Sequence, residues 1–443
     1  MDKFFHIGKR GSSISDEIRA GLTTFLAMAY IIAVNPAVLS GAVLGADGKP
    51  LTSALVTATC VGAGIMTIIM GLAANRPLAC ASGLGVNAMI AAATPGMCGG
   101  DWHEAMGIVF VEGMAILILV LCGLREKIMD AIPVSLRHAI SVGLGLFIAM
   151  IGLVNAGIVV AGKGTVVTLG NVYDPAFIVG IVSIVATLIF AALNVNGGIL
   201  FGIIVAVLVG IPLGVTAAPK GIVDALDFST VGAPFMSDKN GTMGLIKVFA
   251  NPTALVFAFS LMMSDFFDTM GTAMAVAKNG DFLTEDGNVE NIKEILIVDS
   301  AAAAVGGAMG VSSITTFVES ASGAADGGRT GLTSVTTGVL FILAAFFAPL
   351  ISVVSSAATC GALVYVGFLM MTEVREIDWT DLLQGFPAFL TTAGIAMTYS
   401  ISSGIGLGFI AYGLTAIVTG KVKEIKPLMW VAIVAFIIYF LMS

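Results

Sequence analysis

Apolar runs long enough to cross a lipid bilayer follow one another along almost the whole chain. A membrane-spanning helix needs roughly 20 apolar residues, and fewer where the helix is broken. The sequence contains fourteen such runs, seven on each side of a polar stretch at 216–249. The predicted spans are 17–40, 53–74, 78–95, 103–122, 134–156, 175–193, 197–215, 250–275, 292–310, 311–329, 331–349, 358–372, 383–400 and 404–419. A last run, 427–441, is either an additional span or a segment at the membrane interface.

The composition agrees with this succession of spans. Of the 443 residues, 58% are hydrophobic and 11% are charged, whereas a soluble domain has about 25% charged residues. The sequence therefore predicts an all-α polytopic membrane protein that lies in a lipid bilayer. The net charge of −8 indicates no nucleic-acid partner, and the five cysteines show no paired spacing typical of a metal cluster or disulfide framework.

The distribution of cations predicts how the spans are oriented. If the N-terminus is cytoplasmic, fifteen of the twenty Lys and Arg residues lie on the cytoplasmic side, as the positive-inside rule requires. The five on the outer side are Lys49, Lys163, Lys220, Lys239 and Lys247. Seven spans in each half mean that the second half enters the membrane from the opposite side, which predicts two inverted repeats.

The third span of each half is interrupted and rich in small residues. The two segments are 77–96 and 311–331, and each has an extended start followed by a helical continuation. Interrupted segments at matched places indicate a binding site near the middle of the membrane. The N-termini of their half-helices would present free N–H groups to a substrate.

The apolar stretch Val256–Gly271 contains two carboxylates, Asp265 and Asp268. Ionisable residues inside a membrane are rare and usually face a cavity. Their spacing of three places both on roughly one helical face. In the functional interpretation Asp268 binds substrate or carries a proton and Asp265 supports it. In the alternative, both cap a kinked helix at the cytoplasmic boundary.

Three further polar residues are candidates for the same site. Glu319 stands at the expected start of the second half-helix, where it either binds substrate or only stabilises the helix dipole. A second carboxylate beside Asp268 would create repulsion that one bound proton relieves. Asn87 suits the edge of a heterocycle or caps its helix. Thr272 either reaches the site or bonds back into its own helix. Glu112 and Asp299 are both expected to be structural, bonded to the backbone or hydroxyls of the broken segments.

Four motifs resemble the adenine/guanine/hypoxanthine permeases of the nucleobase–ascorbate transporter superfamily. They are SDEIRAGLTTFLAMAYIIAVNPAVLS, GLAANRPLACASGLGVNAM, SDFFDTMGTAMAVA and TTFVESASGAADGGRTGLTSVTTGVLFI. The resemblance implies a uracil-permease-like fold of fourteen spans in two inverted repeats, with a short strand and a half-helix in spans 3 and 10. It also implies a core domain and a gate domain. The core comprises 15–123 and 250–350, the gate comprises 124–216 and 351–419, the extracellular or periplasmic linker comprises 217–249, and the C-terminal segment comprises 420–443.

The resemblance carries the family's binding residues onto particular positions of this chain. The motif asparagine falls on Asn87, the aspartate on Asp268 and the glutamate on Glu319, while Asp326 departs from the small or apolar residue that is usual before GGRTG. The predicted substrate-binding residues are Asn87, Asp268, Glu319, Gly85, Val86, Thr272 and Val318, with the backbone N–H groups near Val86 and Val318 included. The predicted proton-coupling residues are Asp268, Glu319 and Asp265.

These expectations together describe a purine–proton symporter. It would import adenine, guanine or hypoxanthine by alternating access across the plasma (inner) membrane, with no cofactor besides the coupling proton, and the resemblance is compatible with a homodimer. Alternatives are a permease of the same fold for xanthine, uracil or another small heterocycle, and an ion channel. Carboxylates in two matched segments do not suggest a pore-lining ring, which disfavours the channel. No nucleophile–base grouping stands out, so an enzyme is not expected.

Overall fold

The predicted apolar runs fold into helices in a computed structural model that describes residues 2–123, 132–162, 164–195, 197–218, 221–237, 241–284, 289–351 and 353–442. The helices of the first half are α2 (Ile14–Met28), α3 (Ile31–Leu39), α4 (Thr52–Ala73), α5 (Leu84–Gly96), α6 (Trp102–Leu121), α8 (Val134–Asn155), α9 (Pro175–Ala192) and α10 (Gly198–Gly210). Those of the second half are α12 (Pro252–Asn279), α13 (Ile292–Met309), α14 (Ser320–Ala325), α15 (Gly331–Ala344), α17 (Cys360–Met371), α18 (Leu382–Thr398) and α19 (Ile401–Val418). The short elements are α1 (Asp2–Phe5), η1 (Gly8–Arg10), η2 (Ala233–Phe235), α11 (Gly244–Ala250), η3 (Ala345–Phe347), α16 (Ala348–Ile351), η4 (Thr372–Glu376) and η5 (Val422–Glu424).

Within the described ranges, six helical segments are long and apolar enough to cross a membrane. A seventh is obtained if α11 and the first part of α12, which meet at an angle of 100°, are taken as one span. Several other predicted spans are shorter apolar helices, such as α10 and α18, or are broken by a strand. A span that a strand divides has no single helix long enough to be counted as membrane-spanning by its length, so the total of fourteen spans remains a prediction.

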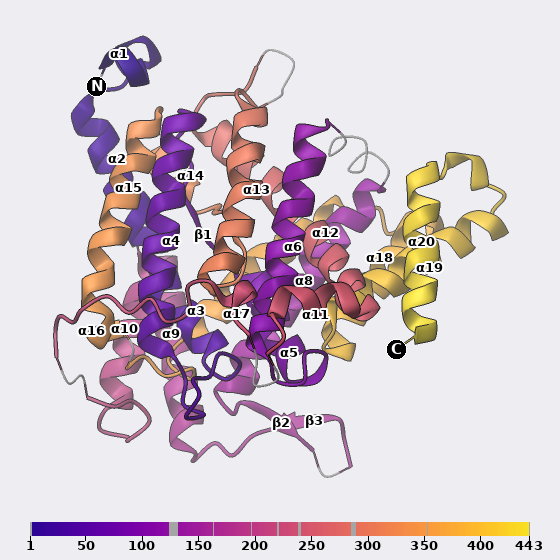
Figure 1. Cartoon of the computed structure of the whole chain (residues 1–443), viewed down its shortest axis with the longest axis horizontal. Helices are drawn as coiled ribbons and strands as arrows, with labels where there is room; N and C mark the ends of the chain where they lie inside the picture. The colour runs from indigo at the N-terminus through magenta and orange to yellow at the C-terminus, as the bar shows by residue number, and fades with distance from the viewer. Residues whose placement is uncertain are drawn as a thin grey trace.

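Spans 3 and 10 each contain a strand followed by a helix, as predicted. Strand β1 (Cys80–Ser82) precedes α5, and β4 (Ile314–Thr316) precedes α14. The two strands pair antiparallel, with Cys80 opposite Thr316, and β1 lies in the middle of the helical body (Figure 1). The pairing satisfies backbone groups that would otherwise be unbonded inside the membrane. It brings the N-termini of the two half-helices to one place.

The helices pack in two groups around this strand pair. In one group α4 packs against α15 and α13, α2 packs against α15 and α14, and α6 packs against α13. In the other group α8 packs against α17 and α18, and α9 packs against α10 and α17. Glycines allow the closest crossings, since a Cβ atom on Gly367 of α17 would lie 2.4 Å from the carbonyl oxygen of Gly145 on α8. Such small-residue contacts are typical of helices that associate inside a membrane.

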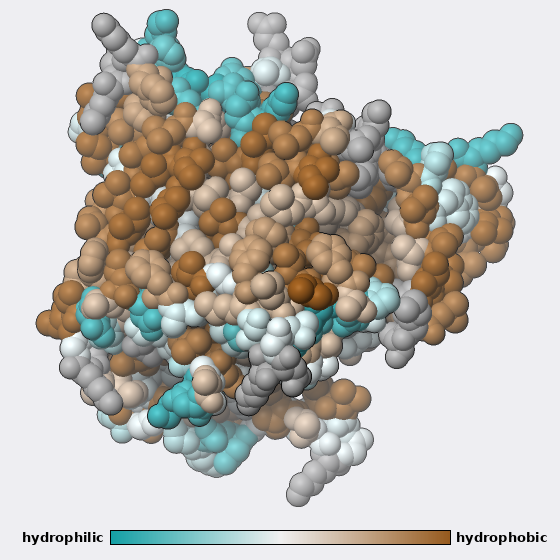
Figure 2. Space-filling view, in the orientation of Figure 1, coloured by the Kyte–Doolittle hydropathy of each residue, from teal (hydrophilic) through white to brown (hydrophobic). Residues whose placement is uncertain are grey.

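The surface has the banding expected of a membrane protein. Figure 2 shows hydrophobic residues across the middle of one face, with hydrophilic residues gathered above and below them.

Several of the cations predicted to be cytoplasmic contact other segments of the protein. Arg10 reaches the backbone carbonyls of Asn75 and Arg329, and Arg76 pairs with Glu290. Of the other cations used for the orientation, Arg125, Lys127, Lys163, Lys220 and Lys239 lie outside the described residues, so the cytoplasmic N-terminus stays a prediction.

The predicted linker and C-terminal segment both contain helices. In the stretch 217–249, α11 packs against α6, and its Lys247 Nζ lies 2.6 Å from Asp101 Oδ2 at the start of α6. At the far end of the chain, α20 (Pro427–Met442) packs against α19 and α12, beside α19 in Figure 1. Outside these helices a hairpin of β2 (Val159–Ala161) and β3 (Val167–Leu169) joins α8 to α9.

Candidate functional site

A pocket lies where the paired strands, the half-helices and the two helix groups meet. Its empty space is about 590 Å³ when the open solvent at its mouth is included. The strand and half-helix segments and α12 supply its polar side, while α8 and α17 supply an apolar wall. The residues that line it are Tyr30, Gly83, Leu84, Gly85, Val86, Leu144, Ile148, Ser264, Asp265, Asp268, Thr272, Thr315, Thr316, Phe317, Val318, Glu319, Val366 and Met370.

Most of the residues predicted from the sequence meet in this pocket. They come from segments far apart in the chain, because β1 pairs with β4 and α12 lies against both β4 and α14. Seven of the eight candidates line it, namely Gly85, Val86, Asp265, Asp268, Thr272, Val318 and Glu319. The pocket also contains polar residues that the sequence did not single out, namely Tyr30, Ser264, Thr315 and Thr316.

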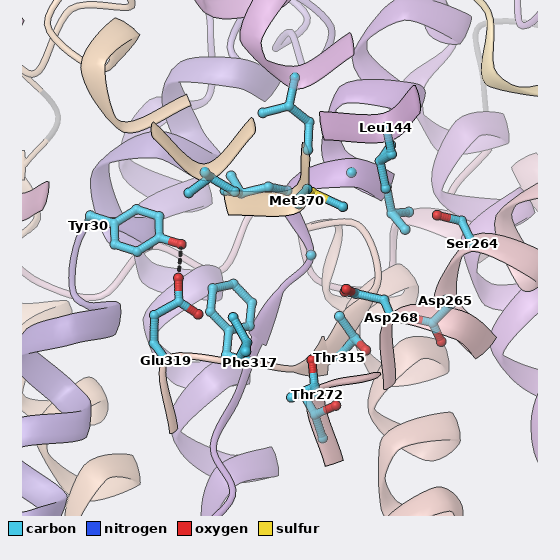
Figure 3. A pocket seen from close by; sticks show the side chains of 18 residues that line it. Tyr30, Leu144, Ser264, Asp265, Asp268, Thr272, Thr315, Phe317, Glu319 and Met370 are labelled. Carbon is cyan, nitrogen blue, oxygen red and sulfur yellow. Dashed lines mark hydrogen bonds between the residues drawn. The ribbon is translucent and has the colours of Figure 1, made fainter. Parts of the chain in front are cut away.

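Asp265 and Asp268 lie in the middle of α12, far from both of its ends. The helix starts after the N-cap Asn251, whose side chain accepts two backbone N–H groups, and ends before Gly280. The interpretation of the two carboxylates as caps of a helix end is therefore wrong. Asp268 is exposed within the pocket, whereas Asp265 is 1% exposed. Figure 3 shows both on the same side of the pocket, beside Ser264 and Thr315.

Glu319 is the N-cap residue of α14, which confirms the predicted start of the half-helix. Its Oε1 atom accepts a hydrogen bond from the Tyr30 hydroxyl over 2.6 Å. Figure 3 shows this pair across the pocket from Asp268. Tyr30 lies between α2 and α3 and is 1% exposed. A buried tyrosine hydroxyl usually has a hydrogen-bond partner. A tyrosine in an apolar span is therefore the sequence feature that could have indicated this contact.

Asn87 lies in the first turn of α5 but is not among the residues that line the pocket. Its side chain is fully buried, and its Nδ2 atom lies 3.5 Å from the carbonyl oxygen of Ser82. Its Oδ1 atom has no hydrogen-bond partner among the residues that the structure describes. The structure therefore does not bring Asn87 to the other candidates, and its role in binding stays a prediction.

Asp299 has the structural role expected of it. Its carboxylate on α13 accepts hydrogen bonds from the Thr269 and Thr315 hydroxyls at 2.6 and 3.1 Å. It also accepts the backbone N–H of Thr316 at 2.9 Å. Thr269 is the threonine next to Asp268, so the carboxylate ties α12 and β4 to α13 directly behind the pocket. Hydrogen bonds to an ionised group are among the stronger ones in proteins.

Asp326, which departs from the small or apolar residue usual before GGRTG, is held by the first span. Its carboxylate lies 3.3 Å from Arg19 Nε and accepts a hydrogen bond from the Thr23 hydroxyl over 2.8 Å. It is not one of the residues that line the pocket. A neighbouring carboxylate that the sequence did not single out, Glu17, is fully buried and accepts the backbone N–H groups of Arg329 and Thr330.

Comparisons with known proteins agree with the fold and with the motifs. The profile of the Permease family matches residues 15–407. The chain is 37% identical to the guanine/hypoxanthine permease PbuG of Bacillus subtilis, over 100% of this chain and 99% of that protein. It is 36% identical to the adenine permease AdeP of Escherichia coli, over 99% of this chain and 95% of that protein.

A solved structure shares the fold at low sequence identity. The transmembrane domain of a cyanobacterium bicarbonate transporter, BicA, superposes with a TM-score of 0.60 at 15% identity and covers 88% of this chain and 97% of that chain. The multi-pass membrane architecture and the resemblance drawn from the motifs are thereby confirmed. The chain belongs to the Permease family, among sequences similar to guanine/hypoxanthine and adenine permeases.

Proposed function

We propose that this protein imports purine nucleobases, namely adenine, guanine or hypoxanthine, by proton symport with alternating access. The observation that carries the proposal is that two carboxylates, Asp268 and Glu319, lie on opposite sides of a pocket whose remaining walls are largely apolar. The edges of a purine have N–H groups that can donate hydrogen bonds to carboxylates, and apolar side chains can cover its flat faces. The names of the similar proteins PbuG and AdeP support the same class of substrate.

The geometry supports one arrangement of the bound base. Glu319 accepts ring or exocyclic N–H groups on one edge, and Asp268 bonds the opposite edge with help from Thr272. Free N–H groups in the first turn of α5, at Gly85 and Val86, and the backbone at Val318 complete the contacts in the plane of the ring. The ring faces are covered by apolar side chains that line the pocket, namely Leu144 and Met370 of the apolar wall and Phe317 after β4.

A proton can couple substrate binding to movement at this site. Ionised Asp268 and Glu319 in one dehydrated pocket repel each other, and a proton on either removes that repulsion. Asp265, buried beside the pocket, is a third candidate to carry the proton. Neutralising a charge lowers the cost of moving the loaded site through the low-dielectric interior.

The two helix groups support alternating access. The polar residues come from the proposed core, 15–123 and 250–350, while Leu144, Ile148, Val366 and Met370 come from the proposed gate, 124–216 and 351–419. Rocking of one group against the other around a fixed site would open the pocket to each side in turn. We place the protein in the plasma (inner) membrane as fourteen spans in two inverted repeats, with a cytoplasmic N-terminus, and as a homodimer.

Uptake measurements test the substrate. Cells that lack their own nucleobase permeases would express the chain and receive labelled adenine, guanine, hypoxanthine, xanthine or uracil. Saturable uptake of one of the first three, abolished by a protonophore, is expected. Uptake restricted to xanthine or uracil would replace the proposed cargo, and ion currents in the absence of any base would indicate a channel.

Variants of the two carboxylates test the site. Glu319→Gln and Asp268→Asn keep the shape of each side chain and remove its charge, so each should reduce uptake by tenfold or more, the loss typical of one charge-assisted hydrogen bond. Asp47→Asn, in an exposed loop where Asp47 pairs with Lys49, is the matched control and should transport normally. Full uptake by both site variants would contradict the assignment.

A further inference from the structure

Tyr30 occupies a special place in the first span. Helix α2 ends at Met28 and α3 begins at Ile31, and Ala29 and Tyr30 join them with helical backbone angles, so that Ile14–Leu39 runs as one apolar span. Between the two helices the side chain of Tyr30 is 1% exposed, and its hydroxyl donates a hydrogen bond to Glu319.

Glu319 lies at the start of a helix that is too short to be stable by itself. Helix α14 has 6 residues, fewer than two turns, and a preceding strand of 3 residues. Isolated helices of this length are unstable without tertiary contacts. The direction of the Glu319 carboxylate is therefore decided by what packs around α14.

The first span supplies much of this packing. A Cβ atom on Gly323 would lie 2.0 Å from Thr24 Oγ1 and 2.5 Å from the carbonyl oxygen of Ala20, so α14 lies directly against α2. At the cytoplasmic end, Asp326 bonds to α2 through Arg19 and Thr23. At the pocket end, the hydroxyl of Tyr30 donates a hydrogen bond to Glu319 itself. The first span thus contacts α14 at both of its ends.

We infer that Tyr30 is a positioning residue that orients Glu319 for the substrate. This inference rests on the proposed function of the pocket. An ionised carboxylate only accepts hydrogen bonds, and each oxygen has its own direction. With Oε1 bonded to Tyr30, Oε2 faces away from the tyrosine (Figure 3) and is the oxygen presented to an N–H group of the base.

The inference also concerns how substrates are distinguished. A carboxylate held by a donor is restricted to one orientation, so it favours bases whose N–H group lies at the matching position. A carboxylate released from Tyr30 can rotate and accept N–H groups from several directions. Loss of the hydroxyl should therefore weaken binding of the best substrate more than binding of poorer ones.

Tyr30→Phe tests this with little risk to folding, because the ring and its packing remain. In proteoliposomes, KM for the preferred purine should rise about tenfold, as expected when one hydrogen bond to a charged group is lost. The maximal rate should change less than about twofold, and the ratio of KM values between preferred and poorer bases should shrink. Tyr412→Phe removes a hydroxyl from a buried tyrosine of α19 outside the pocket and should leave KM unchanged.

A spectroscopic measurement separates positioning from a general effect on structure. In substrate-free protein, the infrared carboxylate band of Glu319, identified by its absence in Glu319→Gln, should shift in Tyr30→Phe and not in Tyr412→Phe. An unchanged band together with an unchanged KM would overturn the inference and leave the proposed function standing. Failure of the wild-type protein to bind any purine would overturn the proposed function instead, even if the band shifts.

Discussion

The backbone N–H of Thr316 donates a hydrogen bond to the Asp299 carboxylate over 2.9 Å, which fixes the strand of the tenth span to the helix before it. The same carboxylate accepts the hydroxyls of Thr269 and Thr315. One fully buried side chain therefore sets the relative positions of α12, α13 and β4. Since Thr315 and Thr316 line the pocket, its shape depends on a residue that does not touch it.

Asp299→Ala should destabilise the protein by about 3 kcal/mol, because it leaves several buried donors without an acceptor. KM for the substrate should also rise, as β4 loses its attachment behind the pocket. Thermal unfolding in detergent and uptake kinetics would measure the two effects. Asp299→Asn keeps one acceptor oxygen and should lose less than half as much stability. Equal stability of Asp299→Ala and the wild type would contradict this role.

Gly85 allows the half-helix α5 to lie close to α8, which forms part of the apolar wall of the pocket. A Cβ atom at this position would lie 2.6 Å from Cδ2 of Leu144 on α8. Gly85→Ala should therefore push Leu144 aside, narrow the pocket and raise KM about fivefold or more, within the about 1–3 kcal/mol cost of overpacking. Kinetics of uptake at several substrate concentrations would measure the change.

A second substitution distinguishes this clash from a general effect of alanine in α5. Leu144→Ala creates the missing space, so the double variant Gly85→Ala/Leu144→Ala should recover much of the lost affinity. Gly96→Ala, in the same helix, meets nothing within 4 Å and should behave as the wild type. Absence of any rescue in the double variant would show that Leu144 is not the obstacle.

Asp326 should have little influence on substrate preference. Its charge is balanced by Arg19 and its hydrogen bond comes from Thr23, at a distance from the pocket lining. Asp326→Ala should change KM by less than about twofold and stability by at most about 1 kcal/mol, as is usual for partly exposed ion pairs. Arg19→Gln should have an equally small effect. A change in the order of preferred bases in Asp326→Ala would refute this expectation.

The contact between α11 and α6 should be sensitive to acid. Burial by itself raises the pKa of Asp101, but hydrogen bonds from His103 and Lys247 outweigh it and hold the pKa well below its usual value. A carboxyl group with a lowered folded-state pKa stabilises the protein above its unfolded pKa of about 3.9. That contribution is lost as the pH falls through the folded-state pKa.

Asp101→Asn should accordingly lower the Tm at pH 7 by about 2 °C. The expected change is smaller than for a fully buried group, because the site is partly exposed to solvent. The difference from the wild type should shrink as the pH falls below about 4. Melting curves of the purified protein across this range, with Asp47→Asn as the exposed control, would measure it. A difference that stays constant down to pH 3 would exclude ionisation of Asp101 as the cause.

Much of the site could be predicted from the sequence because the bilayer makes its polar residues conspicuous. Asp268 and Glu319 stand out as charges in apolar segments, and Gly85, Val86 and Val318 follow from the broken helices that contain them. The structural role of Asp299 could be predicted for the same reason. These arguments use only local sequence and the cost of an unsatisfied polar group in hydrocarbon.

The tertiary structure decided the relationships that depend on packing between distant segments. The hydroxyl of Tyr30 meets Glu319 across 289 positions of the chain, and Asp326 meets Arg19 across 307. Asn87 is one residue from Val86 and still is not among the residues that line the pocket. Hydrophobicity along the chain determines which segments enter the membrane, whereas the direction of a side chain depends on where helices break and how closely their backbones approach.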